Sequence, residues 1–176
     1  MKSFLKRKSR LFAAILLIFA ALLSLCACAH ADKTVPCEDI VKAVTDIEIG
    51  LPAGKIYSSS ADEGEDGYIP DSLLSSLFGE GKHISLFDGW IDFAFFMPSS
   101  AHPCEIVAIL CDTPVTADDT ARLLYRRLNT VKTVKGEEKY ANYIDNAEVN
   151  VCHNYVLLII SADAKTAKKA ALSVIN

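Results

Sequence analysis

The cysteines are the residues of this sequence whose type and spacing most directly indicate chemistry. Cys28 follows Leu25, Cys26 and Ala27. This order fits the bacterial lipobox, in which an apolar residue, a small residue and Ala or Gly precede the cysteine that receives a diacylglyceryl group. Cys26 fits less well, because Leu25 would then precede the cleaved bond, where a residue as small as Ala is needed. We therefore expect cleavage before Cys28 and lipid attachment to its sulfur.

The four later cysteines are candidates for disulfide bonds, because an even number in an exported chain allows full pairing. If Glu105–Leu110 forms one strand, Cys104 and Cys111 lie about 23 Å apart, at about 3.3 Å per residue, too far to pair with each other. Any bridge would then include one of the other two. Buried, reduced thiols remain the alternative. The four candidates are Cys37, Cys104, Cys111 and Cys152.

Metal binding is the other chemistry that these cysteines suggest, since His102 and His153 lie beside Cys104 and Cys152. Thiolate and imidazole are ligands that zinc prefers, but no Cys-x-x-Cys pair occurs after residue 28. Buried or bridged cysteines are the better interpretation. The sequence therefore predicts neither a metal site nor a cofactor.

The hypothesis that this chain is an enzyme depends on carboxylates in two predicted loops. Asp62 and Glu65 lie in an acidic stretch, and Glu105 follows a Pro- and Ser-rich connection. Such side chains could act as general acid and base if the fold brought them together. No serine-nucleophile motif or complete phosphate loop supports catalysis. We assign no catalytic residue, and a noncatalytic role is favoured.

Aromatic and basic side chains offer two further alternatives. Phe93 and Phe95 share one face of a predicted strand, where core packing is more probable than ligand binding. Arg122, Arg126 and Arg127 lie on a predicted helix. A solvated helix face is the default interpretation for them, with an anionic partner as the alternative.

The first 27 residues have the composition of a signal peptide. Five basic residues precede Leu11, and a 15-residue apolar run extends from there to Leu25. As a helix this run would span about 22 Å, less than the roughly 30 Å core of a bilayer. A basic start, a short apolar segment and small residues behind it indicate export. We expect a signal peptide at 1–27, a tether at 28–36 and a single domain at 37–176.

The expected mature chain is acidic. All 22 Asp and Glu residues follow the signal, whereas five of the 18 Lys and Arg residues lie within it. The remaining 13 bases give a net charge near −9. This balance argues against binding of nucleic acid through a general positive field.

Hydrophobic periodicity predicts the elements of this domain. Apolar spacing of three to four residues predicts helices after Pro36, from Asp71, from Thr116 and from Asp163, with Thr116 and Asp163 as caps. Residues 52–70 are rich in Ser, Gly and acid and predict a loop. Strands are expected at Trp90–Met97, Glu105–Leu110, Glu148–Cys152 and Tyr155–Ile160, the last two joined by a turn at His153-Asn154.

From Trp90 the expected order is strand, strand, helix, strand, strand, helix. This order is typical of an α+β domain, with an antiparallel sheet of about four strands and helices packed on one face.

A family resemblance covers about residues 90–176. Its residues are Glu105-Ile-Val-Ala-Ile-Leu110, the long helix, and Asn154-Tyr-Val-Leu-Leu-Ile-Ile-Ser161. These segments resemble a family of small lipoproteins of Gram-positive type, known as domain of unknown function 4358. The family usually has Gly where this chain has His153. The resemblance implies a cell-envelope lipoprotein and implies no activity or catalytic residue.

The sequence therefore predicts a lipoprotein held on the extracytoplasmic face of the cell membrane by lipid on Cys28. We expect a noncatalytic module that binds an envelope protein or a wall polymer. Two alternatives stay open: a small exported enzyme that uses the loop carboxylates, and a lipoprotein that captures substrate for a transporter.

Overall fold

A computed structural model describes residues 34–78, 87–135 and 137–176. The predicted signal peptide and the expected helix end at Gly79 lie outside these residues. Contacts within the chain separate residues 1–34 from a compact unit, Val35–Asn176. This unit begins two residues before the domain boundary expected from the sequence.

Five antiparallel strands form one sheet in the order β1-β2-β3-β5-β4. Their bounds are Gly54–Ser58 (β1), Trp90–Pro98 (β2), Glu105–Cys111 (β3), Glu148–Cys152 (β4) and Tyr155–Ile160 (β5). The α+β class is confirmed. The sheet has one strand more than expected, because β1 lies inside the stretch at 52–70 that composition assigned to a loop.

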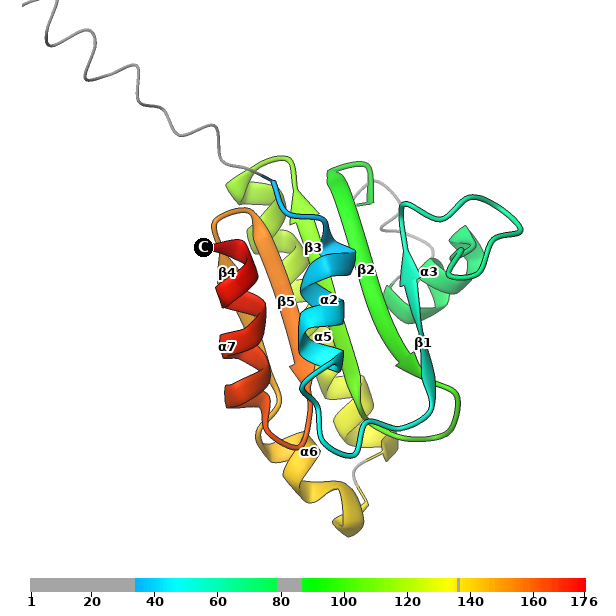
Figure 1. The fold of residues 1–176 in the computed structure, drawn as a ribbon, viewed down its shortest axis with the longest axis vertical. Coiled ribbons are helices and arrows are strands. Elements are labelled where there is room, and N and C mark those ends of the chain that lie inside the picture. Colours follow the sequence, from blue (N-terminus) through cyan, green and yellow to red (C-terminus); the bar gives the residue numbers. More distant parts are fainter. Residues whose placement is uncertain (1–33, 79–86, 136) are drawn as a thin grey trace, which may run out of the picture. The chain divides into compact units, whose positions relative to one another are not determined.

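Helices cover both faces of the sheet, so the expectation of a single covered face was wrong. On one face lie α2 (Cys37–Thr45) and α7 (Ala164–Ile175), side by side in Figure 1. On the other lie α3 (Asp71–Phe78), α5 (Pro114–Lys135) and α6 (Ala141–Asp145), the last preceded by the short 3₁₀ helix η1 (Glu138–Tyr140). The sheet has hydrophobic clusters on both faces for this reason.

Alternation along the central strands assigns their side chains to the two clusters. Val107, Ile109 and Cys111 of β3 pack with α5, whereas Ile106 and Ala108 pack with α2 and α7. Every residue of β3 and β5 is buried. A strand that is buried on both faces needs apolar residues at successive positions, and this explains why the sequences of these two strands are continuously apolar.

A β-bulge at the start of β2 determines on which face of the sheet the first side chains of this strand lie. The register of β2 on β3 shifts between Trp90 and Asp92. The extra residue brings Trp90 onto the same face as Phe93 and Phe95, where all three belong to or pack against one aromatic cluster. Core packing, which the sequence favoured for these rings, is confirmed. Asp92 consequently lies toward α2.

Local chemistry sets the ends of two helices. The hydroxyl of Thr113 accepts a hydrogen bond from the Thr116 amide (3.1 Å) directly before Pro114, the first residue of α5. Thr113 is therefore the cap, and the prediction of Thr116 was wrong; proline at the first helical position favours this start. Asp163 caps α7 as predicted, since its carboxylate accepts from the Thr166 amide at 3.0 Å.

The hairpin between β4 and β5 turns at His153 and Asn154, as predicted. His153 has a φ of 53°, the only positive value among the described residues other than glycine. Glycine adopts this conformation at little cost. The glycine usual in the resembled family would therefore suit the same turn.

Candidate binding surface

The compact unit begins where Val35 is held by a tyrosine. The hydroxyl of Tyr155 accepts a hydrogen bond from the Val35 amide (2.7 Å) and donates one to the Val35 carbonyl (2.9 Å). Burial, the largest cause, raises the pKa of Tyr155, so the phenol keeps its proton at neutral pH. One side chain of β5 thus satisfies both backbone groups of Val35.

Asp92 holds the next turn of chain. Its carboxylate accepts hydrogen bonds from the Cys37 amide (2.7 Å) and from the hydroxyl of Ser59. The Cys37 amide, in the first turn of α2, has no acceptor within the helix, so Asp92 supplies one, and a carboxylate there also interacts favourably with the helix dipole. Together with Tyr155, Asp92 fixes the end of the domain at which the preceding chain arrives.

Glu48 organises the opposite end of β5. Its carboxylate accepts hydrogen bonds from the Ser161 hydroxyl (2.7 Å) and from the Ala162 amide (3.1 Å), which lie between β5 and α7. Five residue steps along β5 separate Tyr155 from Ile160, roughly 17 Å at 3.3 Å per residue. Val35 and Glu48 are therefore held at opposite ends of one strand.

Aromatic side chains gather at the Glu48 end. The ring of His102 lies 4.8 Å from the rings of both Tyr140 and Tyr143, edge to face. His102 Nδ1 accepts a hydrogen bond from the Cys104 amide (3.1 Å), which leaves Nε2 as the proton-bearing nitrogen of the neutral ring. Burial raises the pKa of Tyr143, and Cys104 and Glu48 nearby raise it further.

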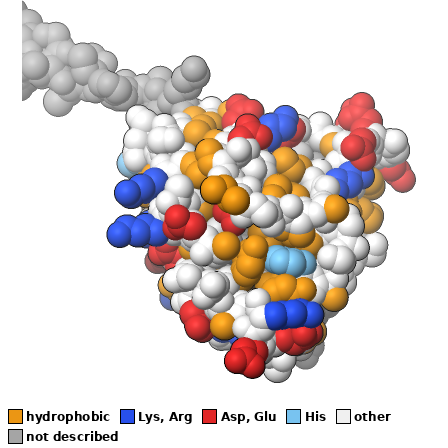
Figure 2. Space-filling model, turned by 60° about the horizontal axis from the view of Figure 1, so that its bottom comes forward, with side chains coloured by type: hydrophobic (Ala, Val, Ile, Leu, Met, Phe, Trp, Pro, Cys, Tyr) orange, Lys and Arg blue, Asp and Glu red, His pale blue; other side chains and the backbone are white. Residues whose placement is uncertain are grey.

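Exposed isoleucines lie on either side of Glu48. Ile47 is 45% exposed and Ile49 is 92% exposed. Figure 2 brings this end of the domain forward and shows hydrophobic side chains gathered around a histidine. We call the five residues Ile47, Ile49, His102, Tyr140 and Tyr143 the aromatic end. The two isoleucines are exposed, whereas the rings of His102, Tyr140 and Tyr143 are half-buried. Exposed apolar side chains beside tyrosine rings are typical of a surface that contacts another molecule.

The carboxylates named in the enzyme alternative are not brought together. Asp62 and Glu65 share a loop after β1, where the Asp62 amide donates to the Glu65 carboxylate at 3.1 Å. Ser58, the last residue of β1, comes directly before this loop and pairs with Ala94 of β2, which in turn pairs with Ala108 of β3. The loop therefore begins two strands away from β3. Glu105 lies three residues further along β3. These three side chains do not form an acid-base pair.

Glu105 instead forms a bidentate ion pair with Arg127. Arg127 Nε donates to one carboxylate oxygen at 2.9 Å and Nη2 to the other at 2.7 Å. The two side chains are only 1% and 13% exposed. The prediction of a solvated face was therefore wrong for Arg127, because α5 packs against β3 at this point. Arg122 and Arg126 are exposed, as predicted.

No disulfide bond joins any of the four cysteines after Cys28 in the described part of the chain. Cys37, Cys104 and Cys111 are buried, and Cys152 is partly exposed. Among the described residues, no group of three or more His, Cys, Asp or Glu side chains is arranged to hold a metal ion. Buried cysteine, one of the alternatives left open by the sequence, describes three of the four.

The stability of the domain is expected to fall above pH 9 because of Cys37. Burial, with a further contribution from Asp92, raises the pKa of this thiol far above 9.0. Below pH 9 the Cys37 thiol is protonated in both the folded and the unfolded chain. Above pH 9 it ionises only in the unfolded chain, which lowers the free energy of unfolding by up to about 1.4 kcal/mol per pH unit. Urea unfolding between pH 8 and 10 should show a smaller decrease for Cys37→Ala than for the wild type. Equal decreases would contradict this assignment.

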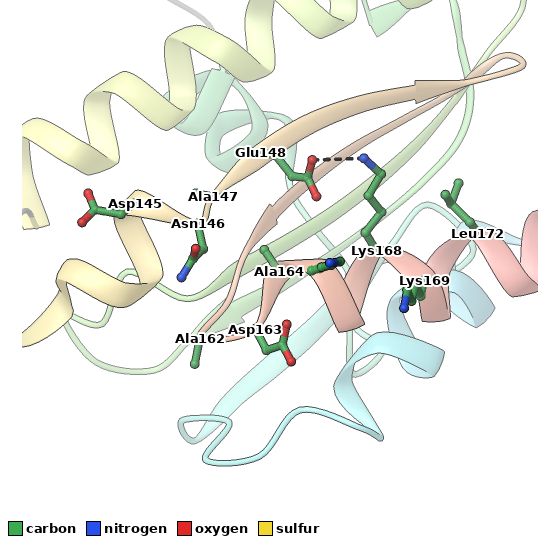
Figure 3. A pocket seen from close by; sticks show the side chains of 11 residues that line it. Asp145, Asn146, Ala147, Glu148, Ala162, Asp163, Ala164, Lys168, Lys169 and Leu172 are labelled. Atoms are coloured by element: carbon green, nitrogen blue, oxygen red, sulfur yellow. Dashed lines mark hydrogen bonds and ion pairs between the residues drawn. The ribbon is translucent and has the colours of Figure 1, made fainter.

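A surface hollow with a volume of about 830 Å³ lies between the start of β4 and α7 (Figure 3). Lys168 spans it and donates to Glu148 at 3.1 Å. The charges in its lining balance, and it is open to solvent. Its charged residues are Asp145, Glu148, Asp163, Lys165, Lys168 and Lys169. The hollow lacks the enclosed apolar lining typical of small-molecule sites.

Comparisons with known proteins add no relative. A scan against protein-family models finds no match, and searches of curated proteins and of solved structures find none either. The resemblance to the lipoprotein family thus remains an expectation from the sequence. Within the described residues, no helix is both long and apolar enough to span a bilayer.

Proposed function

We propose that this chain is a lipid-anchored lipoprotein of the extracytoplasmic membrane face whose domain binds a partner in the cell envelope without catalysis. The observation that carries the proposal is the arrangement of the two ends of β5. Tyr155 and Asp92 fix the arriving chain at one end. At the other end lies the aromatic end, with its two exposed isoleucines and three half-buried rings.

The short tether between Cys28 and Val35 would determine which end of the domain lies near the membrane. Seven residue steps separate Cys28 from Val35, which reach at most about 25 Å when fully extended. A lipid on Cys28 would keep the Val35 end near the bilayer. The aromatic end, displaced along β5, can then contact other envelope components.

The chemistry of the aromatic end favours a protein partner. Tyrosine is enriched at protein interfaces, where its ring supplies apolar contact and its hydroxyl a hydrogen bond. A wall polymer is the second candidate, since ring faces also pack on sugars. The enzyme alternative lacks converging catalytic groups in the described part of the chain. The substrate-capture alternative would need a closing two-lobed cleft, which one compact unit does not supply.

Anchoring is tested by replacing the modified cysteine. Cys28→Ala is expected to move the protein from the membrane fraction into the medium or the soluble extracytoplasmic fraction, because no lipid can then be attached. The matched control is Cys26→Ala, which keeps the lipobox and should leave the protein in the membrane fraction. Equal retention of both variants would contradict anchoring through Cys28.

Binding at the aromatic end is tested by photo-crosslinking in intact cells. A benzoylphenylalanine at position 140 is expected to yield a discrete adduct with an envelope component. The control position is 125, because Tyr125 is 51% exposed on α5 and lies outside the aromatic end. Adducts of the same kind and yield from both positions, or from neither, would argue against this surface as the binding site.

A further inference from the structure

The strand β4 is the outermost strand on its side of the described sheet. It pairs with β5 through a two-residue turn, with Cys152 opposite Tyr155 and Asn150 opposite Leu157. In such a hairpin the residues flanking the turn exchange both backbone hydrogen bonds, and hydrogen-bonded pairs then alternate along the ladder. Val149 and Val151 therefore direct their N–H and C=O groups toward the open edge.

From Val149 to Cys152 this edge has no charged residue or proline to prevent pairing, and the one charge of β4, on Glu148, forms an ion pair with Lys168. Proteins commonly protect edge strands with lysine, proline or bulges. The sequence of β4, Glu-Val-Asn-Val-Cys, contains no lysine or proline, its ladder on β5 is regular, and Val151 is 48% exposed. The opposite edge strand, β1, carries Lys55 in an ion pair with Asp66 (2.5 Å).

A polar atom on β4 also lacks a partner. The side-chain nitrogen of Asn150 is buried and forms no hydrogen bond. An unsatisfied buried donor costs about 1–3 kcal/mol. Asn150 is the middle residue of the strand, with one outward-directed valine on each side.

We propose that β4 pairs antiparallel with β4 of a second copy of this chain, about a twofold axis that passes beside Asn150. The register pairs Val149 of each copy with Val151 of the other, so each pair exchanges two backbone hydrogen bonds. The same register buries the exposed Val151 side chains and places the two Asn150 side chains side by side, where rotation of each side chain would bring its nitrogen, buried within the single copy, to the amide oxygen of the other. A single twofold axis thus gives the open backbone edge its hydrogen bonds, buries the exposed valine and offers the Asn150 amide a partner.

The position of α5 fits this arrangement. α5 packs across both β4 and β5. Because neighbouring strands are about 4.8 Å apart, a helix centred between β4 and β5 would lie about 10 Å from its symmetry mate, an ordinary packing distance. The axis is perpendicular to the sheet, so α2 and α7 of both copies share one face. Both chains would therefore arrive at Val35 on the same side of the dimer.

Disulfide trapping in the full chain tests the register. The Cβ atoms of directly opposed residues lie about 4.5–5.5 Å apart in a non-hydrogen-bonded pair, close enough for a bond after small adjustment. In a Cys152→Ser background, Asn150→Cys is expected to form a covalent dimer under mild oxidation. Val115→Cys is the matched control, because Val115 is 71% exposed at the start of α5, away from β4, and should stay monomeric.

A second variant separates pairing from chance collision. Val151→Lys places a charge on the exposed edge and is expected to abolish the covalent dimer of Asn150→Cys while thermal unfolding stays cooperative. For the soluble Cys28→Ala chain, sedimentation equilibrium should give twice the monomer mass, and Val151→Lys should restore the monomer mass. A monomeric Cys28→Ala chain, or equal dimer yields from positions 150 and 115, would overturn the proposal. The proposal needs no lipid anchor, so its failure would leave the proposed function standing.

Discussion

Arg127→Met is expected to lower the free energy of unfolding by about 3 kcal/mol, because it removes the two charge-assisted hydrogen bonds that Arg127 donates to the buried Glu105 carboxylate. The two side chains are joined by two hydrogen bonds and are nearly inaccessible to water. A domain of this kind has a total stability of about 5–15 kcal/mol. This one substitution is therefore expected to remove a large part of it, as measured by urea unfolding of the Cys28→Ala chain.

The neighbouring arginine provides the matched control. Arg126 is exposed on the same helix, and Arg126→Met should change stability by no more than about 0.5 kcal/mol. The double variant Glu105→Leu/Arg127→Met should recover most of the loss, since it removes both charges from the interior. If Arg127→Met were as mild as Arg126→Met, the pair would not have the structural role assigned to it.

Tyr155→Phe is expected to release the start of the domain and to cost about 1–3 kcal/mol, the sum of two hydrogen bonds. The substitution removes only the hydroxyl that binds the amide and carbonyl of Val35. The packing of the ring between the strands and α2 is retained. Hydrogen exchange should show that the Val35 amide loses its protection while the amides of β3 keep theirs.

Tyr125→Phe is the control for this change, because the Tyr125 side chain is half exposed on α5. It should leave both stability and the protection of Val35 unaltered. Retained protection of Val35 in Tyr155→Phe would mean that other contacts hold the arriving chain. The domain end would then be positioned by Asp92 and α2 alone.

The sequence predicted the α+β class and the four strands with strong apolar patterns. It missed the coverage of both faces, although the signal was present: β3 and β5 are apolar at successive positions rather than at alternate ones. Continuous apolar strands require cover on both faces. The expected single layer of helices conflicted with that pattern.

Two smaller errors have local causes. β1 has only five residues, among them Gly54, Lys55 and Ser58, so its pattern was too weak against a Ser- and acid-rich background. The start of α5 was placed too late because the spacing of Thr116 and Asp119 resembled a capping box. Thr113 directly before Pro114 was the stronger signal, since threonine and proline favour those adjacent positions.

The sequence alone could not show which residues contact each other in the buried ion pair and at the start of the domain. Glu105 and Arg127 are 22 residues apart, and Tyr155 and Val35 are 120 apart. Only tertiary structure brings them together. An acid at the start of a buried strand does, however, require a partner, and Glu105 carries that signal.

Mass spectrometry of the protein purified from membranes would show whether Cys28 carries a lipid. Trypsin cleavage after Lys33 should release a first peptide, Cys28 to Lys33, that carries the mass of a diacylglyceryl group on its cysteine. An unmodified Cys28 inside a longer peptide, or a mature chain that begins at another residue, would contradict the proposal. The domain would then be exported or retained by some other means, and the short tether would lose its role.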